Sequence, residues 1–446
     1  MKCVIKPIDD VINILGEQEV FEGDGRKSIF SVEIPVGKGF LLYNTLTKEC
    51  IFYSTDEELE LDEKKKWYVV PENFKEIDLV DDLRSVFSLT KLVDEGYLSY
   101  TILTTTECNA RCFYCYQQKH SRRSMTVSTA KNVVDYIRNT HKKNKCIELE
   151  WFGGEPLFNK DVIDYICCGL KALNIEFKST MLTNGYLFNK DIISDAVSVW
   201  NLEKVQVSLD GTEEKYNKVK SYLNCKDSAY LRVINNIYCL LDAGISVDVR
   251  LNIDSYNIDN IDVLIDELAD RFKEYKKMRI YCHPLFEETG ITRGRREEER
   301  KKVYEKMRLY AEKIHKLHLG DEVMSVSGRL KTEMCMADSN SSIVIMPDGY
   351  LGKCTNYTDS NYVGHINDDF LDENMLEKFR KHREKIKECY TCSLYPVCIR
   401  LEMCQEQKNC YAEYRESMLD IIKKTVLNEY YKFLEKEKKV GVNNNI

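Results

Sequence analysis

The sequence contains no uninterrupted run that approaches the roughly 18 apolar residues of a membrane span. Residues 1–10 lack the long apolar core of a signal peptide, so we expect a cytoplasmic protein without a membrane partner. Basic residues are not in excess: 65 Lys and Arg stand against 73 Asp and Glu, for a formal net charge of −8 and a pI near 5.6. Proteins that hold nucleic acid by bulk electrostatics are basic, so this balance argues against a nucleic-acid partner.

Internal repeats and low-complexity tracts are also missing, and 446 residues are enough for two to four domains with sizeable cores. Cysteine, in contrast, is abundant, with 18 residues. Disulfides are not expected in a reducing compartment, so clustered cysteines there are metal ligands or catalytic groups. Ten cysteines form two groups: Cys108, Cys112 and Cys115, and then Cys335, Cys354, Cys389, Cys392, Cys398, Cys404 and Cys410. Most of the other eight have apolar surroundings and are expected to be small buried hydrophobes: Cys3, Cys50, Cys146, Cys167, Cys168, Cys225, Cys239 and Cys282.

Residues 1–96 are expected to form a β-rich domain. Runs rich in Ile, Val, Phe and Tyr predict strands at 28–35, 40–43 and 50–53. Two further segments are expected to be helical or solvated, on either side of a turn at 71–73; they are 56–66 and 76–89.

Strand and helix patterns alternate from residue 97 to residue 320. The expected strands are 99–105, 147–152, 176–182, 204–209, 246–253 and 278–283. Helical patterns lie between them, among them 126–140, 161–173 and 231–243. Repeating βα units with nearly continuous apolar strands predict an α/β fold with a parallel sheet. Six units fit a partial (β/α)6 barrel, in which chemistry gathers at the carboxyl ends of the strands.

The third region, residues 321–446, is cysteine-dense and then helical. Apolar residues recur there at spacings of three or four, which predicts a helix with one face packed as core: Leu419, Ile422, Val426, Tyr430 and Phe433. The tail, residues 440–446, is expected to be disordered.

The sequence CNARCFYC at residues 108–115 directly follows the first apolar strand of the expected barrel. Its spacing resembles the CxxxCxΦC signature of the radical S-adenosylmethionine (SAM) superfamily, with Tyr114 as the aromatic residue. A [4Fe–4S] cube is held by Cys thiolates, and the three close thiolates of Cys108, Cys112 and Cys115 leave one of its four iron corners free. The alternative is a zinc site, which prefers paired CxxC knuckles with four ligands.

Gly153-Gly154-Glu155-Pro156 stands at the end of the second expected strand. Glycine lets a backbone approach a ligand closely because it has no Cβ. Glu155 could accept a charge-assisted hydrogen bond from an ammonium group. The segment resembles the superfamily's GGE motif, which implies that it receives the amino group of SAM; an ordinary turn is the alternative.

The next two strands end in Leu182-Thr183-Asn184-Gly185 and Ser208-Leu209-Asp210-Gly211. They resemble segments of the superfamily that bind SAM, which implies that Asn184, Ser208 and Asp210 contact its ribose hydroxyls and carboxylate. Ordinary Asn-Gly and Asp-Gly turns are the alternative, and Asp210 could instead brace its own turn or a substrate.

Arg250 on the fifth expected strand could neutralise a carboxylate, and related enzymes often place a SAM contact there. A solvent-exposed or ion-paired arginine is the alternative. Cys282 and His283 end the sixth strand. A packed thiol and a histidine with its hydrogen bonds satisfied are commoner than catalytic groups, so no catalytic residue is assigned.

The resemblance implies a mechanism. A reduced cluster passes one electron to SAM, whose carbon–sulfur bond breaks to give methionine and a 5′-deoxyadenosyl radical that abstracts hydrogen from the substrate. The cofactor carries the difficult chemistry, and the protein supplies position and water exclusion. A flavodoxin- or ferredoxin-type electron donor is the expected redox partner.

The second cysteine group resembles a SPASM domain, whose pattern is CX9–15GX4C, a gap, CX2CX5CX3C, a gap and C. The first half fits, including Gly349 in its Pro-Asp-Gly turn, but five residues separate Cys398 from Cys404 where three are usual. A zinc-ribbon-like fold is the alternative.

The SPASM resemblance implies two auxiliary [4Fe–4S] clusters, and therefore three in all. Cys335, Cys354 and Cys404 would hold one auxiliary cluster. The other auxiliary cluster would be held by Cys389, Cys392, Cys398 and Cys410. With three protein ligands, the first would have an open iron that could bind a substrate thiolate.

SPASM-bearing radical enzymes mostly modify peptides or proteins, and the N-terminal region helps to choose among them. Residues 39–47 resemble a segment of leader-binding or leader-adjacent domains in maturases of ribosomally made peptides. An exposed strand edge there could pair with an extended leader, although a scaffold cap without a binding role is the alternative. The working hypothesis is a maturase that installs a thioether or another cross-link in a precursor peptide. The alternatives are an anaerobic sulfatase-maturating enzyme that forms formylglycine, and a non-enzymatic iron–sulfur carrier.

Overall fold

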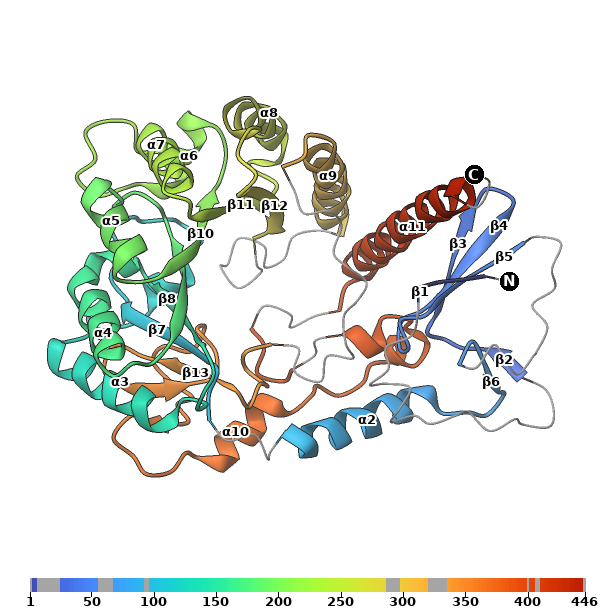
Figure 1. Ribbon diagram of the computed structural model, residues 1–446, viewed down its shortest axis with the longest axis horizontal. Coiled ribbons are helices and arrows are strands. Elements are labelled where there is room, and N and C mark those ends of the chain that lie inside the picture. Colours follow the sequence, from blue (N-terminus) through green and yellow to red (C-terminus); the bar gives the residue numbers. More distant parts are fainter. Residues whose placement is uncertain are drawn as a thin grey trace.

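The computed structural model describes residues 2–5, 25–54, 67–91, 96–285, 297–319, 335–398, 401–405 and 410–443. Its largest element is a sheet of nine strands, in the order β12-β11-β10-β9-β8-β7-β13-β14-β15. Figure 1 shows this sheet and its helices on one side of the molecule, and an N-terminal sheet with the last helix on the other. Segment 56–66 lies outside the described residues.

Six neighbouring strands of the large sheet run parallel and make the partial barrel. They are β7 (Ser99–Thr105), β8 (Ile147–Gly153), β9 (Phe177–Thr183), β10 (Leu202–Leu209), β11 (Ser246–Ile253) and β12 (Met278–Pro284). The sequence predicted each of them to within two residues at either end. The α/β partial barrel is therefore confirmed.

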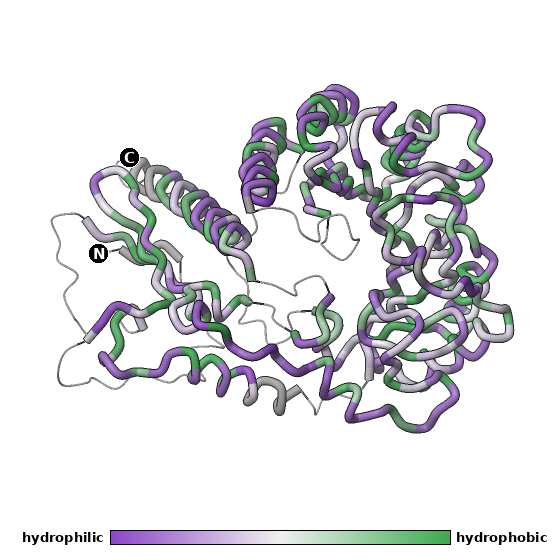
Figure 2. Tube along the Cα trace, turned by 180° about the vertical axis from the view of Figure 1, so that it is seen from behind, coloured by the Kyte–Doolittle hydropathy of each residue, from purple (hydrophilic) through white to green (hydrophobic). Residues whose placement is uncertain are grey.

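Helices cover the outside of the barrel (Figure 1). They are α3 (Val127–Thr140), α4 (Lys160–Ala172), α5 (Lys190–Ser198), α6 (Glu213–Lys220), α7 (Ala229–Asp242) and α8 (Ile261–Phe272). In α3, the Thr126 side chain accepts the N–H of Thr129 and so caps the helix, and one face with Val133 and Ile137 is buried. Figure 2 shows hydrophilic residues interrupting hydrophobic ones along the barrel helices, as expected for helices with one buried face.

The Cys-rich region extends the barrel sheet, which the sequence did not predict. β13 (Ser342–Ile345) pairs in parallel with β7, and β14 (Tyr350–Gly352) and β15 (Gly364–His365) continue the sheet antiparallel. The strands are two to four residues long. A run this short carries no periodicity, and its pairing depends on a strand more than 200 residues away in the sequence. The domain boundary near residue 321 stays a prediction.

The N-terminal sheet has the order β1-β5-β4-β3 and is antiparallel. Its strands are β1 (Lys2–Ile5), β3 (Ser31–Val36), β4 (Gly39–Asn44) and β5 (Cys50–Ser54), beside a small pair of β2 (Gly25–Lys27) and β6 (Val69–Pro71). The long helix α11 (Ala412–Asn443) packs on this sheet: Val426 is fully buried there, and Tyr430 stacks on Phe52 at 5.8 Å between ring centroids. The apolar face predicted for this helix therefore packs as core. The disorder predicted from residue 440 is wrong up to Asn443, where α11 ends, and residues 444–446 lie outside the described residues.

Helix α2 (Glu76–Lys91), predicted as helical or solvated, joins the N-terminal region to the Cys-rich region. Arg84 donates a hydrogen bond to the carbonyl of Tyr395 at 2.8 Å, and the Tyr395 hydroxyl donates to Asp81 at 2.7 Å. Phe30, Ile77, Val80 and Cys389 are among the apolar residues buried at this contact. The remaining described helices are α9 (Glu297–Lys316), α10 (Glu373–Arg380) and the short η2 (Tyr116–Lys119), η3 (Pro156–Asn159), η4 (Ile258–Asn260), η6 (Lys387–Thr391) and η7 (Tyr395–Val397).

The expectation that most cysteines outside the two groups are buried is wrong. Cys50 and Cys167 are fully buried, but Cys146 and Cys168 are exposed. Cys168 directly follows Cys167 on α4, and one residue turns the side chain by about 100°, from the buried to the exposed face. Among the described residues, no helix is both long enough and apolar enough to span a membrane.

Candidate functional site

The loop after β7 carries Cys108, Cys112 and Cys115, all half-buried. The Cys115 N–H donates to the carbonyl of Cys112 at 3.1 Å, and the Ala110 N–H donates to the Cys108 sulfur at 3.4 Å. Burial, followed by the charge of Glu155, raises the pKa of Cys108 to about 11. Burial likewise raises the pKa of Cys112 to about 12. Without a compensating cation, these thiols are therefore protonated at neutral pH.

The described residues contain no three Cys, His, Asp or Glu side chains that converge on a single metal ion. A [4Fe–4S] cube makes a different demand, because each of its thiolates binds a separate iron. The iron also provides the positive charge that keeps a bound thiol deprotonated. Three thiols on one short loop are therefore a donor set that fits a cube.

Glu155 is completely buried at the end of β8 and is held by neighbouring donors. The Thr183 hydroxyl donates to both of its oxygens, at 2.8 and 2.9 Å. The N–H groups of Asn184 and Leu157 donate at 2.8 and 3.2 Å. Burial nevertheless raises the pKa of Glu155 to about 7. The carboxylate thus ties the end of β8 to the end of β9, a bracing role that the sequence did not suggest; direct contact with SAM stays a prediction.

The glycines before Glu155 allow β8 to approach the chain beyond β7. A Cβ on Gly153 would lie 2.1 Å from the carbonyl oxygen of Thr105, and one on Gly154 would lie 2.3 Å from that of Glu107. Gly153 also has a φ of +144°, which L side chains rarely adopt. The sequence predicted that the missing Cβ atoms make room for a ligand, whereas in the structure they make room for neighbouring backbone.

Asn184 connects this brace to the cysteine loop. The side-chain nitrogen Nδ2 of Asn184 lies 2.7 Å from Oδ1 of Asn109 and 3.7 Å from the sulfur of Cys108. The predicted SAM contacts Asn184 and Glu155 and the predicted ligand Cys108 are therefore neighbours, although they lie up to 76 residues apart in the sequence.

A buried ion pair lies on the other side of the loop. Nζ of Lys220 lies 3.0 Å from Oδ2 of Asp210, and these side chains are 3% and 1% exposed. Lys220 also donates to the hydroxyls of Ser208 at 2.7 Å and Tyr114 at 3.0 Å. The Tyr114 hydroxyl donates in turn to Oδ1 of Asp210 at 2.8 Å, and Asn252 donates to the same oxygen at 3.1 Å.

Lys220 is the central residue that the sequence analysis missed. Burial alone would lower the pKa of Lys220, but the charges of Asp210, Tyr114 and neighbouring groups hold it well above its usual value. The residue brings together Tyr114, Ser208 and Asp210, which were all predicted separately. One signal could have found it: a carboxylate predicted at a buried strand end requires a cation.

Arg250 lies within β11, in register with Ser208 on β10. Its guanidinium lies 2.9 Å from Nδ1 of His283. Nδ1 also lies 2.8 Å from the carbonyl oxygen of Pro284; a guanidinium can only donate and a carbonyl can only accept, so the two contacts favour opposite roles for this nitrogen. Burial and the Arg250 charge lower the pKa of His283 to about 3, which keeps the ring neutral, and burial raises the pKa of Cys282 to about 12. Cys282 packs against the barrel core, as expected of a structural residue.

Four cysteines of the second group line one pocket: Cys389, Cys392, Cys398 and Cys410. Arg415 on α11 closes one side of it, with a guanidinium nitrogen 3.2 Å from the Cys410 sulfur. The sequence assigned the same four residues to one auxiliary cluster. Four thiols around one pocket fit such a cluster, while their role as ligands stays a prediction.

The other three cysteines lie closer to the barrel. Cys335 is exposed, and Cys354 and Cys404 are half-buried against the barrel core. Gln117, two residues beyond Cys115, donates to the carbonyl of Thr355, one residue beyond Cys354, at 3.4 Å. The two cysteine-bearing segments are therefore in contact.

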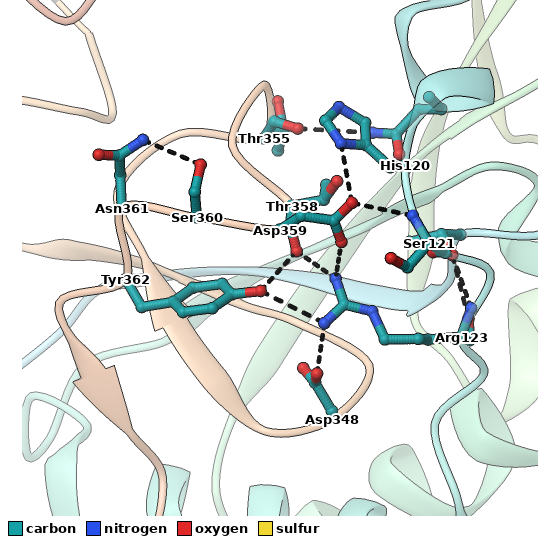
Figure 3. A network of polar contacts seen from close by, with 12 residues as sticks. His120, Ser121, Arg123, Asp348, Thr355, Thr358, Asp359, Ser360, Asn361 and Tyr362 are labelled. Carbon is teal, nitrogen blue, oxygen red and sulfur yellow. Dashed lines mark hydrogen bonds and ion pairs between the residues drawn. The ribbon is translucent and has the colours of Figure 1, made fainter.

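A polar network fixes this contact (Figure 3). Arg123 forms ion pairs with Asp348 and, at 2.7 Å, with Asp359. Asp359 also accepts the Ser121 N–H at 2.9 Å and lies 3.2 Å from Nδ1 of His120. Asp348 belongs to the turn between β13 and β14, so the network joins the loop after the cysteine motif to the strands that extend the sheet.

Residues 102–274 match the family model of the radical SAM superfamily. The chain carries a radical SAM domain. The matched residues include all three cysteines of the loop after β7, the ends of β8 to β11, and Lys220.

Two relatives align with about two thirds of this chain. An uncharacterised protein of Methanocaldococcus jannaschii is 25% identical over 308 residues, which span 66% of this chain and 96% of the relative. A GTP 3′,8-cyclase of Clostridium perfringens is 26% identical over 315 residues, or 64% of this chain and 92% of the enzyme.

Solved structures share the fold. Native anSMEcpe with bound AdoMet and Cp18Cys peptide superposes with a TM-score of 0.56 at 16% identity, covering 78% of this chain and all of that one. Streptococcus suis SuiB bound to precursor peptide SuiA superposes with a TM-score of 0.52 at 15% identity, covering 84% of this chain and 94% of that one. At such identities the likeness concerns the fold alone.

Proposed function

We propose that this radical SAM enzyme is a peptide maturase, which generates a 5′-deoxyadenosyl radical and installs a thioether or another cross-link in a ribosomally made precursor peptide. The observation that carries the proposal is the second thiol-lined site. Cys389, Cys392, Cys398 and Cys410 surround one pocket, and α2 of the N-terminal region packs against the segment that bears them. A reaction that only splits SAM needs neither this site nor the attached β-rich module.

The proposed roles at the barrel follow from the contacts. Cys108, Cys112 and Cys115 would hold a [4Fe–4S] cluster, which supplies the electron for the cleavage of SAM. Lys220 directs its three N–H donors to Asp210, Ser208 and Tyr114, so it would orient Ser208 and Asp210 for contact with SAM and would not bind SAM itself. Burial of these groups excludes water and strengthens their electrostatic interactions.

Three features support a peptide substrate. The exposed strand edge predicted at residues 39–47 is wrong, because residues 39–44 form β4, which is paired with β5 on one side and β3 on the other. Its neighbour β3 is an edge strand of the described sheet and can pair with an extended leader. Two structures with this fold hold a bound peptide, which is precursor peptide SuiA in SuiB and Cp18Cys peptide in anSMEcpe. The SPASM resemblance assigns Cys335, Cys354 and Cys404 to one auxiliary cluster, and three protein ligands would leave that cluster open to a peptide thiolate. A flavodoxin- or ferredoxin-type donor would supply electrons.

The test uses anaerobically reconstituted full-length protein with SAM, reductant and short cysteine-containing peptides encoded beside its gene. Mass spectrometry should find a peptide that has lost two hydrogens and whose cysteine resists alkylation. Formylglycine in a sulfatase-motif peptide would instead establish the sulfatase-maturating alternative. Conversion of GTP would establish the reaction named for the Clostridium perfringens relative. Absence of 5′-deoxyadenosine under all conditions would leave the iron–sulfur carrier.

Iron content tests the cofactors separately. Three clusters correspond to about twelve iron atoms per chain. Replacing Cys389 and Cys392 by Ala should remove about four of them and leave the loop after β7 loaded. A content of about four iron atoms in the unsubstituted protein would contradict both auxiliary clusters.

A further inference from the structure

The first turn of α11 carries a cation at the four-cysteine pocket. This pocket is the one lined by Cys389, Cys392, Cys398 and Cys410. Arg415 is the fourth residue of α11, is half-buried, and belongs to the same lining. The helix dipole opposes a positive charge in the first turn of a helix, so helix stability does not account for an arginine at this position.

The Arg415 side chain contacts one of the four cysteines directly. Its nitrogen Nη1 donates to the sulfur of Cys410 at 3.2 Å and to the carbonyl oxygen of the same residue at 3.3 Å. The bond to the carbonyl braces the chain just before α11, but it does not require the guanidinium to reach the sulfur as well. A charged donor makes a stronger hydrogen bond to an ionised acceptor than to a neutral one, so a thiolate at Cys410 would be the preferred partner.

The rest of the pocket wall strengthens the influence of this charge. Leu394 and Tyr395 are buried in the wall, and Met418 is half-buried there. Apolar surroundings lower the local dielectric constant, which strengthens electrostatic interactions inside the pocket. Glu388 also belongs to the lining, but it is exposed, so water and salt screen its carboxylate.

The cysteine loop after β7 is arranged differently. Its sulfurs accept hydrogen bonds from neutral donors: the Ala110 N–H lies 3.4 Å from the Cys108 sulfur, and the side-chain amide of Asn184 lies 3.7 Å from it. Lys220, the buried cation beside this loop, directs its donors to oxygen atoms. Contact between a charged donor and a cysteine sulfur therefore distinguishes the four-cysteine pocket from the loop.

Such a contact matters for an iron–sulfur cluster because it acts on the reduction potential. This potential depends on the net charge of the cluster, on hydrogen bonds to its sulfurs and on exposure to solvent. One-electron reduction makes the cluster and its thiolates more negative, so a neighbouring guanidinium stabilises the reduced state more than the oxidised state. At a zinc site the same contact would have no redox effect, because Zn²⁺ does not change its oxidation state.

We propose that Arg415 raises the reduction potential of the cluster that the four-cysteine pocket would hold. Arg415 is a positioning residue, because it acts on the cluster through the sulfur of Cys410. The electron comes from an external low-potential reductant, dithionite in the assay, and one electron enters the cluster with no bond formed or broken. The inference rests on the cofactors of the proposed function, but not on its peptide substrate.

The experiment is a redox titration of the reconstituted full-length protein, in which electron paramagnetic resonance follows the reduced clusters. The signal of this cluster is the one that is lost when Cys389 and Cys392 are replaced by Ala. Arg415→Gln removes the positive charge, and Arg415→Lys keeps it. The matched control is Lys387→Gln, which removes a charge at an exposed position two residues before Cys389 and outside the pocket lining.

Arg415→Gln should lower the equilibrium constant for reduction at least about tenfold, which corresponds to a potential lower by about 59 mV for a one-electron couple. Arg415→Lys and Lys387→Gln should each change this constant by less than about threefold, because the first keeps the charge and the second removes one that solvent screens. The iron content should stay the same in all three variants.

Equal shifts in Arg415→Gln and Lys387→Gln, or an unchanged potential in Arg415→Gln, would overturn the proposal. A protein without a signal that depends on Cys389 and Cys392 would overturn it as well. Loss of about four iron atoms from Arg415→Gln would have the same meaning, because the residue would then be needed to hold the cluster and not to set its potential.

The peptide assay separates this inference from the proposed function. A shifted potential in a protein that cross-links no peptide would contradict the proposed function alone. Cross-linking by a protein whose potential does not respond to Arg415→Gln would contradict the role of Arg415 alone.

Discussion

Replacing Lys220 by Met tests the central electrostatic feature of the site. Lys220 and Asp210 lie 3.0 Å apart and are almost completely buried. At an effective dielectric constant of about 20, two unit charges at this separation attract by about 5 kcal/mol. Removing one partner of a buried ion pair leaves the other as an uncompensated buried charge, which lowers the free energy of unfolding by about 3–5 kcal/mol. We therefore expect Lys220→Met to lower the free energy of unfolding by about 4 kcal/mol.

The assay is urea denaturation of the iron-free protein in a Trp67→Phe background. Fluorescence then reports on Trp151 and Trp200, both fully buried in the barrel. Circular dichroism must give the same transition for a single free energy to apply. Lys218→Met, exposed two residues earlier on α6, is the control and should cost less than about 0.5 kcal/mol.

A double variant separates charge from packing. Lys220→Met combined with Asp210→Asn removes both charges, so no buried ion is stranded. The double variant should be at least about 2 kcal/mol more stable than the sum of the two single losses predicts. Additive losses, or a cost of Lys220→Met no larger than that of the Lys218 control, would refute the argument that this ion pair organises the site.

Three further substitutions test the structure around this ion pair and at the N-terminal sheet. Gly154→Ala places a Cβ against backbone atoms and should lower the free energy of unfolding by more than about 3 kcal/mol or abolish folding. The control Gly244→Ala has open space for a Cβ but a φ of +83°, and it should lower the free energy of unfolding by about 1–2 kcal/mol in the same denaturation assay. The pKa of Glu155 is about 7 in the folded protein and about 4.5 in the unfolded chain. The protonated carboxyl therefore contributes fully to the free energy of unfolding below pH 4.5, and about 3 kcal/mol of this contribution is lost as the pH rises through 7. Glu155→Gln should remove that fall; an unchanged pH profile would contradict the shift. Val426→Ala removes a buried contact at the N-terminal sheet and should lower the free energy of unfolding by about 2 kcal/mol and speed amide hydrogen exchange in β4. Ile421→Ala, at an exposed position of α11, is the control and should have neither effect.

The strands of the barrel could be predicted because each is specified by residues that are adjacent in the sequence. Each strand is an apolar run bounded by turn residues, and each motif stands at the end of a strand, where parallel topology brings them to one edge. Asn184, Ser208 and Asp210 stand at such strand ends, and their resemblance to superfamily segments singled them out. Residues 342–345 carry equally apolar side chains, but their membership of the sheet is decided by pairing with β7, which local pattern does not encode.

Lys220 could not be found by local pattern. It ends a helix whose sequence, EEKYNKVK, contains three lysines, and nothing in that segment distinguishes the buried one from Lys215 and Lys218. Its burial is set by Asp210 and Tyr114, which are brought to it by β10 and the cysteine loop. The spacing of the second cysteine group was informative in part, because Cys389, Cys392, Cys398 and Cys410 line one pocket. Cys404, which follows the departure in spacing, is not among the residues of that pocket.

The two networks at the barrel mouth have a common consequence for the cysteine loop. At its start, Cys108 is placed by Asn184, whose backbone is held by Glu155. Toward its end, Tyr114 is placed by Asp210 and Lys220. The loop is thus anchored to β8 and β9 at one thiol and to β10 and α6 beside the others. Any substitution that loosens one anchor should shift the thiols relative to one another, so the residues predicted as SAM contacts also set the geometry in which three thiolates could share one cluster.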